Sequence, residues 1–92
     1  MDSKQIEKIS KALGDTNRLK ILFDMSKHKG CMQCSQITNV LKLAQPSVSH
    51  HIKTLTDAGL ITAEKDGRHH SYQLNKELLK SYLKKLSTIA GD

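Results

Sequence analysis

The two cysteines of the chain, Cys31 and Cys34, lie three positions apart, and His28 precedes the first by the same interval. Thiolate and imidazole groups bind Zn²⁺ and thiophilic metalloids, so this H-x2-C-x2-C cluster could hold such an ion, although a fourth ligand for a closed structural site is missing nearby. The two thiols could instead oxidise to a disulfide, because a cysteine at the start of a helix reacts more readily. They could also only pack, since a free cysteine behaves as a small hydrophobic residue. The pattern leaves these three interpretations open.

The composition favours nucleic acid over a membrane as the partner. The 92 residues carry a formal net charge of +6, and a basic surface attracts polyanions. No apolar run approaches the ~18 residues that a membrane span needs, and residues 1–4 do not open a signal peptide. We therefore expect a cytoplasmic protein without a membrane partner, in a compartment where thiols stay reduced. The length fits a single domain over residues 1–92.

Apolar residues at helical spacing predict the elements that position these groups. Residues 2–13 form an amphipathic helix, and Asp15 is the expected N-cap of a second helix, which is apolar nearly all round and should be central and buried. A short third helix carries an apolar set within residues 37–41. Asn75 caps a last helix, whose broad apolar stripe runs to residue 89.

A fourth helix follows the third after a few residues. Pro46 fits only in the first turn of a helix and Gly59 is typical of a helix end, so the helix lies between them. Beyond it, alternating apolar residues on both sides of Asp66-Gly67 predict a β-hairpin. The expected order is α-α-α-α-β-β-α, a mainly α fold with a small β-hairpin.

The fourth helix has one face suited to reading DNA. On a helical wheel of about 100° per residue, Val48, Ile52 and Leu55 form a buried stripe. The opposite side and the N-terminal end carry small or flat hydrogen-bonding groups and one cation: Gln45, Ser47, Ser49, His50 and Lys53. The N-terminal residues of a recognition helix meet base edges in the major groove, where Gln pairs with adenine, while Lys binds phosphate. The alternative is an ordinary amphipathic helix with a polar face.

The tip of the hairpin is the second candidate contact with DNA. Arg68 could reach a neighbouring minor groove, whose negative potential attracts arginine, and His69 and His70 could contact phosphate. A solvated charged turn is the alternative interpretation. The adjacent pair His50-His51 is a poor chelate, because neighbouring residues do not share a helix face.

Three segments, KALGDTNRLKIL, AQPSVSHHIKTLTDAGLI and DGRHHSYQL, make the chain resemble the ArsR/SmtB (arsenical-resistance-repressor) family of winged helix-turn-helix regulators. The resemblance covers roughly residues 6–83. It implies a homodimeric repressor that binds an imperfect palindrome in double-stranded DNA and leaves it when an inducer binds. The implied DNA contacts are Gln45, Ser49, His50 and Arg68, to which the wheel adds Ser47 and Lys53. The implied dimer interface lies on the first and last helices, where we assign to it Ile6, Ile9, Leu13, Leu79, Tyr82, Leu83 and Leu86.

The chain also departs from the family's pattern. Metal-sensing relatives carry cysteines at the positions of Gln33 and Ser35, or Asp and His on the last helix, and this sequence has neither set. The inducer could therefore be a thiol redox signal, a metal or metalloid, or absent. The same register puts Cys34 at the start of the third helix, at least partly buried, and Cys31 in the preceding connection as the more exposed thiol. Ala44 stands where relatives often have a capping serine.

Other functions have less support in the sequence. A thioredoxin-type C-x-x-C opens a helix after a strand of a βαβ unit, and no strand is predicted before Cys31. No Ser/His/Asp set, glycine-rich phosphate loop or paired carboxylate cluster suggests catalysis, so we expect no enzyme. A winged-helix module that binds protein or RNA is the remaining alternative, because a fold does not fix a function.

Overall fold

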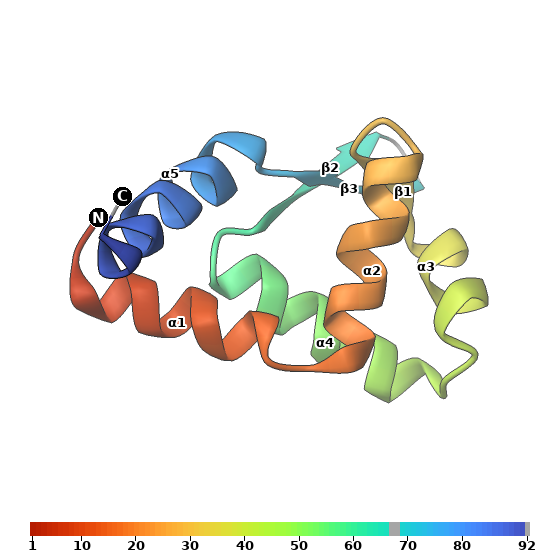
Figure 1. The fold of residues 1–92 in the computed structure, drawn as a ribbon. Helices are drawn as coiled ribbons and strands as arrows, with labels where there is room; N and C mark the ends of the chain where they lie inside the picture. The colour runs from red at the N-terminus through yellow and green to blue at the C-terminus, as the bar shows by residue number, and fades with distance from the viewer. Residues whose placement is uncertain (67–68, 92) are drawn as a thin grey trace.

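The computed structural model describes residues 1–66 and 69–91, with the side chains of Asp66 and His69 outside this description. Helices dominate the described chain, and a small sheet lies at one end of the molecule (Figure 1). The elements in chain order are α1 Ser3–Leu13, α2 Thr16–Lys27, β1 Cys31–Gln33, α3 Cys34–Leu41, α4 Gln45–Asp57, β2 Ile61–Asp66, β3 His69–Leu74, α5 Lys76–Ser87 and the short 3-10 helix η1 Thr88–Ala90. Within the described ranges, none of these helices combines the length and apolar character that crossing a bilayer requires.

Short polar side chains begin two of the helices where the sequence indicates. The carboxylate of Asp15 accepts hydrogen bonds from the backbone N–H groups of Asn17 and Arg18, at 2.8 and 3.1 Å, at the start of α2. At the start of α5, Oδ1 of Asn75 accepts from the N–H of Leu78 at 3.1 Å. These side chains satisfy N–H groups that have no partner within the helix. Both predicted N-caps are confirmed.

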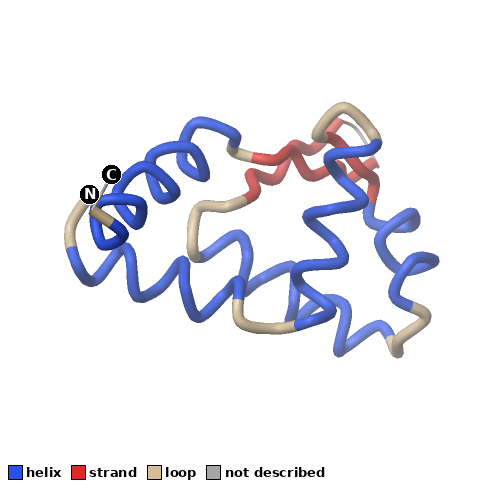
Figure 2. The backbone as a smooth tube through the Cα atoms, in the orientation of Figure 1, coloured by secondary structure: helices blue, strands red, loops and turns tan. Residues whose placement is uncertain are grey.

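The three strands form one antiparallel sheet in the order β1-β3-β2 (Figure 2). The predicted hairpin is confirmed, since β2 pairs with β3 from Ile61 opposite Leu74 onward. The sheet has one strand more than predicted, because Met32 pairs with Tyr72 and adds β1 to the free side of β3. Three residues with a single buried side chain are too few to show the alternation that identifies a strand in a sequence.

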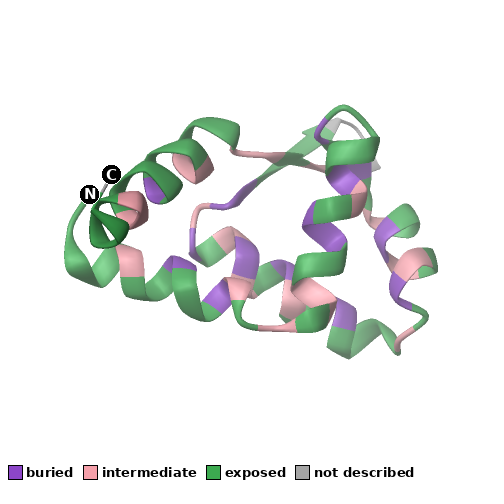
Figure 3. Ribbon diagram, in the orientation of Figure 1, coloured by how far each residue is buried: buried purple, intermediate pink, exposed green. Residues whose placement is uncertain are grey.

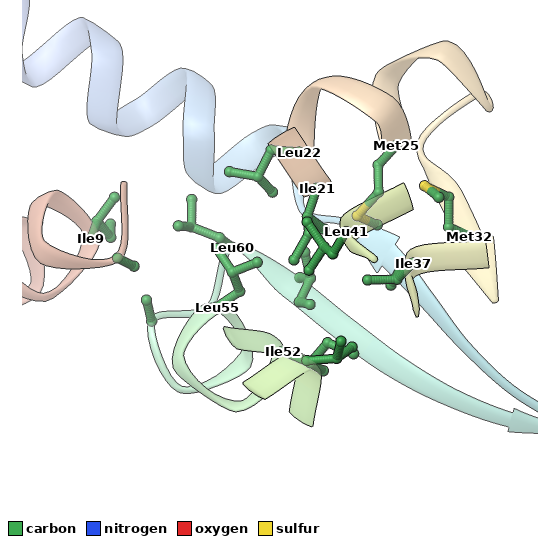
Figure 4. Packing of buried hydrophobic residues seen from close by; sticks show 14 of the residues in the cluster. Ile9, Ile21, Leu22, Met25, Met32, Ile37, Leu41, Ile52, Leu55 and Leu60 are labelled. Carbon is green, nitrogen blue, oxygen red and sulfur yellow. The ribbon is translucent and has the colours of Figure 1, made fainter. Parts of the chain in front are cut away.

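One buried apolar core joins the helices to the sheet (Figures 3 and 4). Its largest fully buried side chains are Ile9, Ile21, Met25, Met32, Ile37, Val48, Leu55, Leu60 and Ile61. The stripe predicted on the fourth helix is confirmed, because Val48, Ile52 and Leu55 are the buried residues of α4. The second helix differs from the prediction, since Phe23 is 67% exposed and one side of α2 therefore faces away from the core.

Helices α1 and α5 lie side by side at the end of the molecule where both termini are found (Figure 1). A hydrogen bond of 2.7 Å between Ser10 Oγ and Tyr82 Oη connects them. The sequence assigned Ile9 and Tyr82 to a dimer interface, but their exposed fractions are 0% and 5% within the single chain. Both side chains therefore pack in the protomer's own core, and the apolar surface that α1 and α5 can offer a partner is narrower than predicted.

Candidate nucleic-acid interface

Helices α3 and α4 form a helix-turn-helix through residues 42–44. Lys42 ends α3 in the left-handed conformation, with φ of 54°, and its N–H donates to the carbonyl oxygen of Thr38 at 3.0 Å. Ala44 is the N-cap of α4 and makes no side-chain capping hydrogen bond, while Pro46 lies in the first turn as predicted. Residues Ala44 to Ser47 are all exposed, so the N-terminal end of α4 faces solvent.

The other end of α4 is closed by Gly59, whose φ is 81°. The N–H of Gly59 donates to the carbonyl oxygen of Thr56 at 2.9 Å, and the N–H of Leu60 donates to that of Leu55 at 3.1 Å. This pair of bonds is a Schellman motif, which favours glycine because its residue must adopt a positive φ. The predicted helix stop is confirmed, and the chain turns from it directly into β2.

The outer face of α4 carries the polar groups that the sequence predicts as DNA contacts. All five are exposed: Gln45, Ser47, Ser49, His50 and Lys53. Gln45 and Ser49 lie one turn apart with Nε2 and Oγ separated by 3.5 Å. One turn further, Nζ of Lys53 lies 3.0 Å from Oδ2 of Asp57 in an exposed ion pair. Gln45, Ser47 and Ser49 therefore present uncharged donors and acceptors, and the amine of Lys53 follows one turn after Ser49.

The hairpin formed by β2 and β3 is the wing beside this helix. Lys65 pairs with His70 across the hairpin, and both side chains are exposed, so basic groups gather towards its tip. Arg68, the predicted minor-groove contact, lies outside the described residues, as does the side chain of His69. The described part of the wing thus carries the amine of Lys65 and the imidazole of His70 together with the exposed carboxylate of Glu64.

Comparison with known proteins identifies the arrangement. Residues 15–63, from the N-cap of α2 into β2, match the family model for bacterial regulatory proteins of the arsR family. The arsenical resistance operon repressor of Staphylococcus aureus is 38% identical over 89 residues, which cover 97% of this chain and 84% of that protein. The chain belongs to the ArsR family of bacterial regulatory proteins.

Solved structures share the fold of this ArsR-family chain. The crystal structure of an ArsR family transcriptional regulator aligns over 97% of this chain and 93% of its own, with a TM-score of 0.79 and 27% identity. A homodimeric winged helix-turn-helix DNA-binding domain from Mycobacterium bovis aligns over 95% of this chain and 79% of its own, with a TM-score of 0.75 and 20% identity. The predicted winged helix-turn-helix is confirmed, and the ArsR family is one of transcriptional regulators and not of enzymes.

The two cysteines of this ArsR-family chain lie on different elements. Cys34 is half-buried and begins α3, as predicted. Cys31 is exposed, as predicted, but it is the first residue of β1 and not part of an irregular connection. Cys34 and Tyr72 line a pocket of about 300 Å³ together with residues of α4. Burial, and after it the nearby Cys34, raises the pKa of the Tyr72 hydroxyl.

The structure does not bring His28 into a common site with the two cysteines. His28 is the exposed C-cap residue of α2. In the part of the chain that is described, no three His, Cys, Asp or Glu side chains gather closely enough to hold a metal ion. The H-x2-C-x2-C spacing therefore does not become a three-ligand site in the described chain, and both cysteines are free thiols.

A polar contact lies behind the recognition helix and was not predicted from the sequence. The side chain of His51 is 12% exposed, and its Nδ1 lies 3.2 Å from Nη1 of Arg18 in α2. Its ring is tilted by 55° to that of the exposed His50, and the two ring centroids are 5.8 Å apart. The hydrogen bond from the backbone N–H of Arg18 lowers the pKa of nearby Asp15, aided by the charge of the Arg18 side chain and opposed by desolvation. The only available signal was the place of His51 at the edge of the buried stripe on the wheel.

Proposed function

We propose that this ArsR-family regulator is a repressor that binds an imperfectly palindromic operator in duplex DNA as a homodimer, with α4 in the major groove. The observation that carries this proposal is the exposed face of hydrogen-bonding side chains on the first two turns of α4. The formal net charge of +6 adds attraction to phosphate. The single core shared by helices and sheet supports one domain over residues 1–92. We infer that a regulator that binds an operator acts in the cytoplasm.

The residues of α4 have different proposed roles. Gln45 and Ser49 read base edges, because amide and hydroxyl groups can donate and accept hydrogen bonds there. Ser47 lies beside them at the exposed N-terminal end, and His50 extends the same polar surface. Lys53 binds a phosphate, and to do so it must break its ion pair with Asp57.

The wing supplies the second proposed contact. Arg68 enters the neighbouring minor groove and His69 contacts the DNA backbone, roles that are assigned from the sequence of the predicted turn. The exposed Lys65 and His70 support this role, because they bring further basic groups to the same region.

We place the dimer contact on α1 and α5. Leu83 is 55% exposed, and together with Leu13, Leu79 and Phe23 it lines an apolar groove of about 400 Å³. A second copy of the chain would remove this surface from water. The predicted interface residues that keep exposed surface are Ile6, Leu13, Leu79, Leu83 and Leu86. A two-fold dimer would place its two copies of α4 about 34 Å apart, one turn of DNA.

The proposal is tested by selecting bound duplexes from a random DNA library and measuring their affinity by fluorescence anisotropy. We expect an enriched palindromic sequence, and an affinity that falls steeply between low and moderate salt as counterions are released from the DNA. A library without enrichment, or an affinity that does not change with salt, would reject operator binding. Sedimentation of Leu83→Glu beside the exposed control Lys80→Glu tests the dimer, which only the first change should weaken.

Substitutions on α4 separate base reading from phosphate binding. Gln45→Ala and Ser49→Ala should relax the sequence preference, with a loss of about 1–3 kcal/mol on the preferred sequence only. Lys53→Ala should weaken binding by a similar factor on all sequences and reduce the salt dependence. A uniform loss in Gln45→Ala or Ser49→Ala would show that these residues do not read bases.

The same binding assay tests the cysteines as an inducer site. Release from DNA on oxidation in the wild type, retained binding in Cys31→Ser and Cys34→Ser, and recovery with reductant would identify a thiol switch. An identical response of the wild type and the double variant would assign both residues to packing.

A further inference from the structure

One arginine side chain connects three helices. Nε of Arg18 donates to the carbonyl oxygen of Ala12 at 2.7 Å, and Nη2 donates to that of Lys11 at 3.2 Å. Both carbonyl groups belong to the last turn of α1, whereas Arg18 lies in the first turn of α2. The remaining nitrogen, Nη1, lies 3.2 Å from Nδ1 of His51 in α4. The guanidinium therefore contacts the end of α1 and the recognition helix at the same time.

The chemistry of this contact fixes the role of the histidine ring. A guanidinium has only donors, so Nδ1 of His51 accepts the hydrogen bond and carries no proton. The neutral ring then has its proton on Nε2. The carboxylate of Asp15 lies 4.0 Å from Nη1 of Arg18 and 3.9 Å from Nδ1 of His51, so an anion faces the guanidinium from the start of α2.

A directional polar contact adds to the apolar packing that holds α4. Val48, Ile52 and Leu55 anchor the helix in the core, but burial of apolar surface has no direction. The hydrogen bond between Arg18 and His51 is directional, and their side chains are only 13% and 12% exposed. His51 also lies about 200° round the helix from Ser49, on the side away from the proposed base readers.

We propose that His51, held by Arg18, is a positioning residue that fixes the recognition helix against the C-terminal end of α1 and thereby sets the affinity for specific DNA. The inference rests on the proposed function, in which α1 takes part in the dimer contact and α4 reads the operator. The Arg18 side chain then connects α1, which takes part in the proposed dimer contact, to the recognition helix α4. His51 itself does not touch DNA.

Two substitutions of His51 separate the hydrogen bond from the volume of the ring. Leucine fills space but cannot accept a hydrogen bond, whereas the amide oxygen of asparagine can take the place of Nδ1. His28→Leu is the matched control, because His28 is exposed at the opposite end of α2 from Arg18. The probes are a duplex selected from a random library by the wild type and a duplex of scrambled sequence. Circular dichroism at the assay temperature and sedimentation check that each variant is folded and dimeric.

We expect His51→Leu to lose about tenfold in affinity for the selected duplex and less than about twofold for the scrambled one, since misorientation of α4 affects base contacts more than phosphate attraction. His51→Asn should recover most of the loss, and His28→Leu should bind like the wild type. Equal binding by folded His51→Leu and wild type, or a His51→Asn as weak as His51→Leu, would overturn the inference.

A spectroscopic measurement tests the contact apart from DNA binding. In ¹⁵N-labelled wild type, Nδ1 of His51 should resonate as an unprotonated, hydrogen-bonded acceptor and Nε2 as the protonated nitrogen, and Arg18→Leu, which removes the donor, should shift the Nδ1 resonance towards that of an acceptor without this hydrogen bond. A proton on Nδ1 of the neutral ring would refute the hydrogen bond. If the wild type selects no duplex at all, the proposed function fails, and the nitrogen spectrum still decides whether the contact exists.

Discussion

Replacing Ala44 by serine is expected to stabilise the recognition helix and raise the free energy of unfolding. Ala44 is the N-cap of α4, its backbone is extended with φ of −63° and ψ of 148°, and its methyl group offers no acceptor to the first turn. A serine there could accept from the N–H of Ser47. Pro46 has no N–H, so only one of the two usual capping bonds can form. The exposed position leaves room for the hydroxyl.

The size of the gain follows from this geometry. Exchanging alanine for a capping residue raises the free energy of unfolding by about 0.5–2 kcal/mol. The lower part of this range applies here because the N–H of Ser47 already donates to the carbonyl oxygen of Ala44 at 3.0 Å. We therefore expect about 0.5–1 kcal/mol, which corresponds to a rise in Tm of roughly 2–8 °C for a domain of this size. Thermal and urea unfolding at one fixed protein concentration measures it, because the stability of a dimer depends on concentration.

Threonine and valine at the same position provide the matched control. The two side chains have nearly the same shape, and only threonine has the hydroxyl that can cap the helix. Ala44→Thr should therefore be more stable than Ala44→Val by several tenths of a kcal/mol. Equal stability of the two variants, or a serine variant no more stable than wild type, would show that the missing cap does not limit the recognition helix.

Three further predictions concern Gly59, Asp15 and Asp57, which lie in or near the recognition helix α4. Gly59→Ala should cost about 1–2 kcal/mol of unfolding free energy in urea titrations, because φ is +81° and a Cβ would lie 3.2 Å from Cδ2 of Leu78; an unchanged midpoint would contradict the strain. The pKa of Asp15 is lowered in the fold, so its contribution to stability is complete above the unfolded pKa of about 4 and is lost as the pH falls through the folded value. Asp15→Asn, which keeps a capping acceptor, should flatten this acid decline in pH-dependent unfolding, and an equally steep decline would assign it to other carboxylates. Asp57→Asn removes the ion-pair partner of Lys53 and should raise affinity for duplex DNA about twofold at low salt in anisotropy titrations, a gain that should shrink at higher salt; unchanged affinity at low salt would argue against a phosphate contact by Lys53.

The local elements of the fold could be predicted because their causes lie within a few residues. The caps at Asp15 and Asn75 form hydrogen bonds two to three positions ahead, and Gly59 ends α4 through bonds within the same turn. The buried stripe of α4 repeats with the period of the helix. The same period placed Gln45 and Ser49 on one exposed face, so the candidate interface with DNA was visible in the sequence.

Contacts between distant segments were decided only by the tertiary structure. Strand β1 exists because Met32 pairs with Tyr72 of β3. A segment of three residues is too short for a periodicity that would predict this pairing. The hydrogen bond between Arg18 and His51 joins residues 33 positions apart. Sequence spacing reports which side chains share a face of one element, but which faces meet depends on how the elements pack. For the same reason, only the packed structure shows that Ile9 lies in the protomer's core while Phe23 faces solvent.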